Sequence, residues 1–278
     1  MFINCKGHLI DLESPKVMGI LNLTPDSFYD GGKYKSEKGI IKQVEKMHVE
    51  GATFIDLGAY SSRPKAKDVS EDEELHRLLP VLELLVKEFP DIFISVDTFR
   101  SRVAREAINR GACMINDISA GALDDQMFST VAQCQVPYII MHMIGTPQTM
   151  GQHVFYKNLI KEMIYYFSQK IFQLRELGIN DLIIDPGFGF SKTLDQNFEL
   201  LQKLELFKSL ELPVLAGLSR KSMLYNLLDI NPEQALNATT SANTIALMKG
   251  TNILRVHDVK EAMDAVRIVE KMTNRPSA

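Results

Sequence analysis

Short apolar runs recur along the chain, and the longer segments between them carry apolar residues at helical spacing. Eight runs are candidate strands: residues 17–21, 54–57, 92–96, 114–115, 138–141, 182–184, 214–216 and 253–256. Most of these runs are continuous rather than alternating, which is typical of strands buried on both faces of a parallel sheet. The pattern therefore predicts a protein in which parallel strands alternate with helices.

The segments between the runs also contain helix start and stop residues. In residues 70–87, apolar residues recur at steps of three and four, and Ser70 with Glu73 forms the sequence pattern of a capping box. Gly111 and Gly178 follow two other helical segments, as helix-terminating glycines commonly do. These features place helix ends close to the ends of the apolar runs.

Eight strand–helix alternations close naturally into a barrel, so we expect an α/β protein with a (β/α)8 TIM barrel fold. An open doubly wound sheet is less favoured, because no glycine-rich nucleotide turn follows the first strand. Residues 2–11, divided at Lys6 and Gly7, predict a short hairpin that closes the barrel floor. No Pro- or Ser-rich linker interrupts the chain, so we expect residues 1–278 to form a single barrel domain without an internal boundary.

Composition says less about the fold than about the class of protein and its cellular compartment. The 278 residues are 45% hydrophobic and 24% charged, as in an ordinary globular protein, and the net charge of −4 provides no basic field for nucleic acid. Three cysteines without metal-type spacing favour a reducing cytoplasm. The N-terminal residues do not resemble a signal peptide, and no apolar stretch approaches the ~18 residues of a membrane span.

Every predicted strand ends in hydrogen-bonding residues. They are Asn22, Asp56, Asp97, Asn116-Asp117, His142, Asp185, Ser219-Arg220-Lys221 and Arg255 with His257-Asp258. One such residue is usually a cap or turn former. In a barrel, however, all these ends converge on the face that carries the active site, so together they predict one polar pocket.

The charges in this ring are sorted. Carboxylates and amides follow strands three, four and six, whereas Arg220, Lys221, Arg255 and His257 follow strands seven and eight. A short extra helix is also predicted at residues 222–228, and loops seven and eight with such a helix form the usual phosphate site of this fold. The pattern favours a ligand that has a nitrogen-rich ring and a phosphate group.

Residues 185–193, DPGFGFSKT, look like a phosphate loop but match neither nucleotide pattern. Ser191 and Pro186 occupy the positions where a Walker loop needs glycine, and Lys192 stands where the dinucleotide pattern needs its third glycine. We therefore expect Lys192 and Thr193 to open the next helix. Long loops after Asn22 and Leu57 are expected to act as lids over the pocket.

The chain resembles the dihydropteroate synthase family over nearly its whole length. The resemblance is carried by GILNLTPDSFYDGG, GATFIDLG with SSRP, ISVDTFR, GACMINDISAG, MHMIGTPQTM, LIIDPGFGFSKT, LAGLSRKSML and ILRVHDVKE, all in the family's order. It implies a (β/α)8 barrel, commonly a homodimer, that condenses 7,8-dihydropterin-6-ylmethyl diphosphate with 4-aminobenzoate. The products are 7,8-dihydropteroate and diphosphate. The resemblance also implies assistance by Mg2+, a place in folate biosynthesis and competition by sulfonamides.

The resemblance also implies roles for individual residues. Catalysis involves Asp97, Lys221 and Asn22, and Asn22 contacts the metal. The pterin is bound by Ser62, Asp97, Asn116, Met141, Asp185 and Lys221, with Asp185 accepting from two adjacent N–H groups. Diphosphate is bound by Arg63, Arg255 and His257. The 4-aminobenzoate site contains Phe28, Pro64, Phe190, Ser219 and Ser222, with the start of the short helix facing the carboxylate.

One loop departs from the family pattern. Tyr60 stands where the family commonly has glutamate, and Lys65 stands where it commonly has glycine. This difference keeps a non-catalytic pterin-binding paralogue as an alternative. A second alternative is methyl transfer from methyltetrahydrofolate to a corrinoid protein. The SRKS and RVHD segments count against it, because a methyl donor has no diphosphate to bind.

Overall fold

A computed structural model describes residues 1–23, 37–60 and 69–273. Eight parallel strands form its main sheet: β3 (Lys16–Asn22), β4 (Phe54–Gly58), β5 (Phe93–Asp97), β6 (Met114–Asp117), β7 (Tyr138–Met141), β8 (Leu182–Asp185), β9 (Leu215–Ala216) and β10 (Ile253–Val256). The strands are hydrogen-bonded in the order β8-β7-β6-β5-β4-β3-β10-β9, and a parallel bridge from Ile184 to Val214 joins β8 to the segment before β9. The predicted barrel is confirmed.

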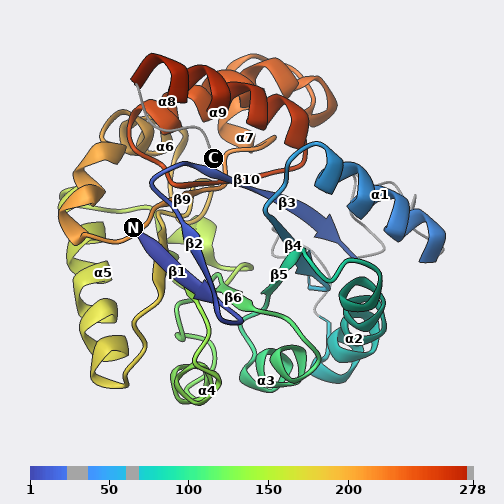
Figure 1. Ribbon diagram of the computed structural model, residues 1–278. Coiled ribbons are helices and arrows are strands. Elements are labelled where there is room, and N and C mark those ends of the chain that lie inside the picture. The colour runs from blue at the N-terminus through green and yellow to red at the C-terminus, as the bar shows by residue number, and fades with distance from the viewer. Residues whose placement is uncertain (24–36, 61–68, 274–278) are drawn as a thin grey trace.

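Helices surround the strands in the described part of the chain (Figure 1). They are α1 (Glu37–Val49), α2 (Glu71–Glu88), α3 (Ser101–Asn109), α4 (Met127–Cys134), α5 (Leu159–Glu176), α6 (Leu194–Gln202), α7 (Ser222–Leu227), α8 (Leu236–Met248) and α9 (Val259–Thr273). Short 3-10 helices occur at η1 (Met150–Gln152), η2 (Leu204–Leu210) and η3 (Pro232–Gln234). Together, the strands and helices repeat the β–α unit that the apolar pattern predicted.

Two helix starts were predicted from the sequence, and one of them differs in detail. Ser70 caps α2 by accepting from the Glu73 N–H (3.2 Å), but the Glu73 carboxylate accepts from Arg77 Nε (2.8 Å) instead of completing a capping box. A complete capping box forms at α6, between Thr193 and Gln196. Thr193 therefore opens this helix, as predicted.

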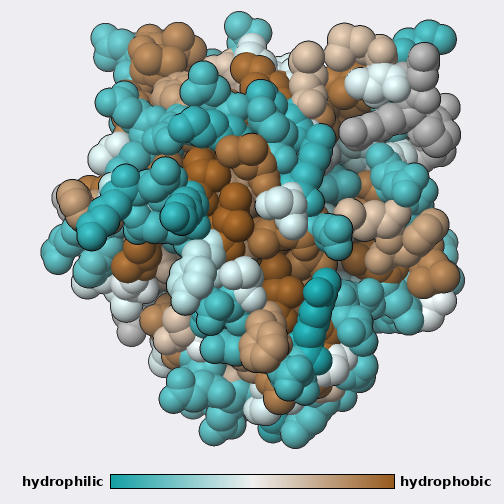
Figure 2. Space-filling view, turned by 90° about the vertical axis from the view of Figure 1, so that its left-hand side faces the viewer, coloured by the Kyte–Doolittle hydropathy of each residue, from teal (hydrophilic) through white to brown (hydrophobic). Residues whose placement is uncertain are grey.

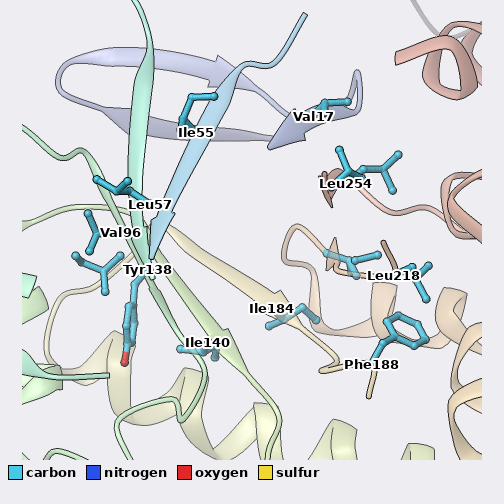
Figure 3. Close-up of a cluster of buried hydrophobic side chains, with 14 of the residues drawn as sticks. Val17, Ile55, Leu57, Val96, Tyr138, Ile140, Ile184, Phe188, Leu218 and Leu254 are labelled. Carbon is cyan, nitrogen blue, oxygen red and sulfur yellow. The ribbon is translucent and has the colours of Figure 1, made fainter. Parts of the chain in front are cut away.

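Alternation along the strands separates two sets of side chains. Ile55, Leu57, Val96, Ile184 and Leu254 belong to the main core cluster together with apolar residues of the helices (Figure 3). Successive side chains of a strand point to opposite faces. The residues between them, Asp56, Asp97, Asp185 and Arg255 among others, therefore point into the barrel.

The lower part of the barrel interior is apolar. The hairpin formed by β1 (Phe2–Cys5) and β2 (His8–Asp11) lies across the barrel in Figure 1. Its buried side chains pack against residues near the N-terminal ends of the strands, and this cluster contains Ile3, Cys5, Ile10, Leu12, Met18, Phe54, Cys113, Met114, Ile139, Ile183, Leu215 and Ile253. The hairpin thus closes the barrel floor, as expected, and leaves the polar ring at the opposite end.

The outer surface is mixed. Figure 2 shows the side on which α5 lies in Figure 1, with apolar residues gathered in a band between polar ones. Phe172 on α5, Leu177 directly after it and Leu206 on η2 are exposed. In the described ranges, no helix is both long and apolar enough to cross a membrane.

Candidate active site

The strand register brings the predicted polar residues to one end of the barrel. Asp97 lies opposite Gly58 on one neighbouring strand and opposite Asn116 on the other, and Asp185 lies opposite Met141. The carboxyl ends of parallel barrel strands form the face where active sites occur. The predicted convergence of these side chains is therefore present in the structure.

Four of these side chains form one network. The Arg255 guanidinium donates through Nε to Asp56 Oδ2 (2.6 Å) and through Nη2 to Asp97 Oδ2 (2.8 Å). Asn116 Nδ2 also donates to Asp56 Oδ2 (2.9 Å). The network joins the carboxylates from β4 and β5 to a cation from β10 across the barrel interior.

Burial changes the proton affinities of this network. It raises the pKa of Asp97 to about 7, although Arg255 favours the ionised form; Asp56 adds a further upward contribution. Burial alone would lower the pKa of Arg255, because it disfavours the charged guanidinium. The attraction of the Asp56 and Asp97 carboxylates is larger than this effect, so the pKa of Arg255 is raised above its ordinary value. Arg255 is therefore charged at every physiological pH, whereas Asp97 titrates near neutrality.

Asp56 was not among the predicted ligand-binding residues. It is fully buried, and its Oδ1 has no hydrogen-bond partner among the described residues. A buried carboxylate oxygen without a partner is costly, so this atom is suited to accept a hydrogen bond from a bound ligand. The pattern FIDLG, with one charge inside an apolar strand, is the sequence feature that points to it.

Asp185 lies beside this network at the end of β8. It is 7% exposed, and its Oδ1 accepts from the Gly187 N–H (2.8 Å). Burial raises the pKa of Asp185, while the Gly187 N–H and the charges of Lys221 and Arg255 oppose that change. The carboxylate thus keeps acceptor capacity inside the pocket for N–H donors of a ligand.

An aromatic and a cation flank Asp185. Lys221 Nζ lies 4.4 Å from the centroid of the Phe190 ring, within the range of a cation–π interaction. Phe190 and Met141 belong to one buried cluster with Ile118, Met143 and Met150. The pocket therefore has an apolar side next to its polar ring.

Ser219 and His257 join the ends of β9 and β10. Ser219 Oγ lies 3.0 Å from His257 Nδ1 and accepts from the His257 backbone N–H (3.2 Å). In a neutral ring, Nδ1 accepts the serine hydroxyl hydrogen and the proton resides on Nε2, which becomes a donor. Ser222 is exposed at the first position of α7.

Arg220 does not belong to the basic half of the pocket, contrary to the sequence expectation. Its guanidinium donates to both carboxylate oxygens of Asp258 (2.9 and 2.7 Å) and to the Pro232 carbonyl (3.1 Å). Its backbone has φ +55°. Arg220 thus joins the segment before α8 to the residue before α9, and it serves the structure of these connections.

Two other polar strand-end residues are structural. Asp117 accepts from the Ser119 N–H (2.7 Å), the Gly121 N–H (2.8 Å) and the Tyr138 hydroxyl (2.6 Å), so it holds the turn after β6. His142 is buried, and burial with the nearby Lys192 charge lowers its pKa to about 2. His142 is therefore a neutral core residue rather than part of the polar pocket.

Lys192 is buried, whereas its sequence position predicted a place at the start of a helix. It does not lie in the first turn of α6 but is buried beneath the loop after β8, 9% exposed. Its Nζ contacts the carbonyls of Gly187 and Phe190 (3.0 Å each) and His142 Nδ1 (3.2 Å). The burial of the lysine depends on contacts that only the fold creates.

Asn22, the predicted metal-contacting residue, ends β3 near Asp97. A Cβ added at Gly58 would lie 3.7 Å from Asn22 Oδ1 and 3.5 Å from Asp97 Cβ, so glycine leaves room between these side chains. No cluster of three His, Cys, Asp or Glu residues suited to a metal occurs in the described residues. A lone amide oxygen fits Mg2+ that takes its other ligands from water and phosphate oxygens.

Four predicted site residues, Phe28, Ser62, Arg63 and Pro64, lie outside the described residues. The neighbouring Tyr60 is described. Its hydroxyl accepts from Gln148 Nε2 (3.1 Å), and its ring lies 5.3 Å from the Arg100 guanidinium carbon. Tyr60 thus connects the end of β4 to the loops after β5 and β7.

Comparison with known proteins agrees with this geometry. The family model described as "Pterin binding enzyme" matches residues 18–257. Dihydropteroate synthase of Escherichia coli K12 is 43% identical over 97% of this chain and 96% of its own length, and that of Haemophilus influenzae is 43% identical over 99% and 100%. A Yersinia pestis dihydropteroate synthase structure with a sulfonamide drug superposes with a TM-score of 0.94 at 41% identity and covers 99% of this chain and 100% of its own. By sequence and by structure, the chain belongs to the dihydropteroate synthase family of pterin-binding enzymes.

Proposed function

We propose that the protein condenses 7,8-dihydropterin-6-ylmethyl diphosphate with 4-aminobenzoate to form 7,8-dihydropteroate and diphosphate, as a transferase of folate biosynthesis. The observation that carries the proposal is the set of inward-facing acceptors, Asp97, Asn116 and Asp185, next to Arg255 and Lys221. Acceptors suit the N–H groups of a pterin, and cations suit diphosphate. The full-length similarity to dihydropteroate synthases supports the same reaction.

The pterin is proposed to bind in the barrel interior. Asp185 accepts from two adjacent N–H groups of the ring, Asn116 and Asp97 bind other ring nitrogens, and Lys221 donates to a ring acceptor. Asp185 and Asn116 are 7% and 4% exposed, so a bound ring would replace little solvent around them. Met141, buried in the adjacent apolar cluster, would contact the ring face.

The diphosphate is proposed to lie between Arg255 and His257. Arg255 remains charged because of its carboxylate neighbours, and the Nε2 of a neutral His257 is a donor while Nδ1 is engaged by Ser219. Asn22 would supply one oxygen ligand to Mg2+, and bound Mg2+ neutralises charge on diphosphate oxygens. The resemblance also assigns Arg63 to diphosphate binding, and this role stays a prediction.

The chemistry requires no strong base. The bond between the pterinylmethyl carbon and the diphosphate oxygen breaks, and its electron pair leaves with diphosphate. The dihydropterin ring delocalises the resulting cation, which the ionised Asp97 carboxylate stabilises. The aniline nitrogen of 4-aminobenzoate then donates its lone pair to that carbon, and it loses one proton to solvent.

The second substrate is proposed to bind between the β8 and β9 loops. Phe190 provides an apolar face, and Ser219 and Ser222 lie on either side of Lys221, which contacts that ring. A Xanthomonas albilineans dihydropteroate synthase with bound 4-aminobenzoic acid is 37% identical to this chain, with a TM-score of 0.90 and 99% coverage of both chains. Sulfonamides would compete at this position.

The deciding experiment is a diphosphate-release assay with Mg2+ and both substrates. Release that requires both substrates and is inhibited by a sulfonamide competitively with 4-aminobenzoate supports the proposal. Pterin binding without release at saturating substrates would instead support a non-catalytic paralogue. Methyl transfer from methyltetrahydrofolate without diphosphate release would support the corrinoid methyltransferase.

We also propose that the protein is a cytoplasmic homodimer. Cys5, Cys113 and Cys134 are free thiols, which suits a reducing compartment. Large apolar side chains are exposed on or directly after the last three helices, α7, α8 and α9: Leu227, Leu228, Ile245, Met248, Ile268 and Met272. Such exposed apolar surface is suited to a second copy. Sedimentation equilibrium tests the assembly, and a monomer at micromolar concentration would contradict it.

A further inference from the structure

Lys192 is a buried lysine whose hydrogen-bonding capacity is fully used by the loop after β8. Its ammonium has three N–H donors, and three acceptors surround it: the Gly187 carbonyl, the Phe190 carbonyl and His142 Nδ1. A buried charge is tolerated only when it is hydrogen-bonded in this way. The match between donors and acceptors indicates a specific structural task for this side chain.

Two of the three contacts lead directly to the proposed pocket. Gly187, whose carbonyl binds Lys192, donates its own N–H to Asp185 Oδ1 (2.8 Å). Phe190, whose carbonyl also binds Lys192, presents its ring to Lys221 at 4.4 Å. One ammonium therefore supports both the carboxylate and the aromatic side chain that face the substrates.

The loop needs such a support because its own backbone bonds are few. Residues 186–191 contain Gly187 and Ser191 with φ of +71° and +48°, and within the loop Phe190 N–H binds the Gly187 carbonyl at 3.1 Å. A left-handed conformation is unfavourable for serine. The Ser191 hydroxyl binds the backbone of Ile144 at both N–H and carbonyl (2.9 Å each), so the loop is held from the β7 side as well.

The charges of Lys192 and Asp185 also link these two residues. Burial lowers the pKa of Lys192 to about 7, and the nearby Asp185 carboxylate opposes this by favouring the charged ammonium. The His142 ring stays neutral and therefore accepts at Nδ1. Lys192 and Asp185 thus stabilise each other's charged forms inside the barrel rim.

We propose that Lys192 is a positioning residue for pterin recognition: it holds the 186–191 loop so that the Gly187 N–H orients the Asp185 carboxylate. This inference rests on the proposed function for the identity of the substrate. Lys192 itself touches neither substrate. Its contribution is transmitted through Asp185, and this makes the two residues energetically coupled.

A double-mutant cycle tests the coupling, with kcat and KM measured for the dihydropterin diphosphate. Lys192→Met keeps the apolar length and removes the charge. Because hydrogen bonds to charged groups contribute about 1.5–3 kcal/mol, we expect kcat/KM to fall about 30-fold, mainly through KM. In the Asp185→Asn background, the same change should cost less than about threefold, because the group it positions is already disabled.

The inference would be overturned if the fall in kcat/KM of the double variant equalled the product of the falls in the two single variants. A KM of Lys192→Met within threefold of wild type would also overturn it. Lys203→Met is the matched control, since Lys203 lies at the other end of α6 and binds only the surface residue Glu199 in the described contacts (2.8 Å). Its kinetics should equal wild type. If Lys192→Met does not fold, Lys192→Gln takes its place, with the same coupling expected.

The inference can fail separately from the proposed function. If the wild-type protein releases no diphosphate, the function is wrong, and the cycle is repeated on equilibrium binding of 6-hydroxymethylpterin, followed by its fluorescence. Weaker pterin binding by Lys192→Met, without a further loss in the Asp185→Asn background, would uphold the positioning role. Unchanged pterin binding would end it.

Discussion

Individual polar residues at strand ends have different tasks, and the direction of the side chain decides which. Asn116 and Asp117 are neighbours, but Asn116 points into the barrel and donates to Asp56, whereas Asp117 holds the turn after β6. Arg220 and Arg255 show the same contrast, since Arg220 binds Asp258 outside the pocket and Arg255 binds Asp56 and Asp97 inside it. Chemical type alone does not separate these cases.

Replacing Arg255 by alanine should have two effects. The diphosphate loses a cation, so KM for the dihydropterin diphosphate should rise at least about 30-fold, while binding of an unphosphorylated pterin changes much less. Asp56 and Asp97 also lose their cationic partner inside the protein, which should lower the free energy of unfolding by about 3 kcal/mol. Steady-state kinetics, pterin titration and urea denaturation measure the three quantities.

Arg102→Ala is the matched control for this prediction. Arg102 is 57% exposed and binds Glu71 and Asp72 on the surface, so its loss should leave KM and the melting temperature unchanged. Equal affinity of the Arg255→Ala protein for the phosphorylated substrate would show that Arg255 does not bind the diphosphate.

The raised pKa of Asp97 predicts a pH dependence. The ionised carboxylate is the form that accepts N–H groups and stabilises the pterinyl cation, and Asp97 takes up its proton as pH falls through about 7. kcat/KM for the dihydropterin diphosphate should therefore decline below pH 7, by about tenfold per unit once Asp97 is mostly protonated. Asp97→Asn, neutral at all pH values, should show lower activity without this decline. A flat wild-type profile from pH 5 to 8 would refute the role of Asp97.

At the scale of elements, the connections from strands to helices position the side chains of the proposed site. The β8–α6 connection turns sharply at Gly187, is held by Lys192 and ends at the Thr193 capping box. Its residues thus position Asp185 on one side and begin a helix on the other. The β9–α7 connection similarly places Lys221 beside Phe190 while Arg220 anchors it to Asp258.

Two glycines test the β8–α6 connection. Gly187 and Gly178 have similar φ values of +71° and +77°. A Cβ added at Gly187 would lie 2.3 Å from the His142 carbonyl oxygen, whereas a Cβ added at Gly178 would meet no atom within 4 Å. Gly178→Ala should cost about 1 kcal/mol of stability and leave KM unchanged. Gly187→Ala should cost more and raise KM for the dihydropterin diphosphate at least about tenfold, because the loop must shift. Urea denaturation and kinetics compare them; equal KM values would argue against a tightly packed loop.

Across the whole molecule, the barrel divides stability and recognition between its two ends. The hairpin and the lower strand residues form an apolar cluster, while charged and amide side chains occupy the interior of the upper end. The polar network therefore does not contribute to the apolar packing at the barrel floor. This division also separates the effects of substitutions at the two ends.

Substitution in the hairpin should affect stability only. Ile3 is 1% exposed in the floor cluster, so Ile3→Ala should lower the free energy of unfolding by about 3 kcal/mol and leave both KM values unchanged. Leu9→Ala in the same hairpin is the control, because Leu9 is 72% exposed and its loss should have little effect. Thermal denaturation and steady-state kinetics check both. A changed KM in Ile3→Ala would mean that the floor is coupled to the pocket.

Much of this architecture was predictable from local pattern. The runs at 138–141 and 253–256 coincide with β7 and β10, and other runs lie within one or two residues of the observed strands. The short helix predicted at residues 222–228 is α7, which spans Ser222–Leu227. Asp97, Asn116 and Asp185 were found because they end strands, whereas Asp56 was not assigned a ligand role and Lys192 was assigned to a helix start.

The order of apolar runs, the glycine and capping residues and the family motifs were enough to establish the barrel and the reaction family, because periodicity and turn chemistry are local properties of the chain. Only the folded barrel decided which polar residues share an interior. Arg255 and Asp56 are 199 positions apart and meet at 2.6 Å, and Lys192 reaches His142 across 50 positions. Such contacts depend on strand register and side-chain direction. Those in turn are set by closure of the whole sheet, and no single segment encodes them.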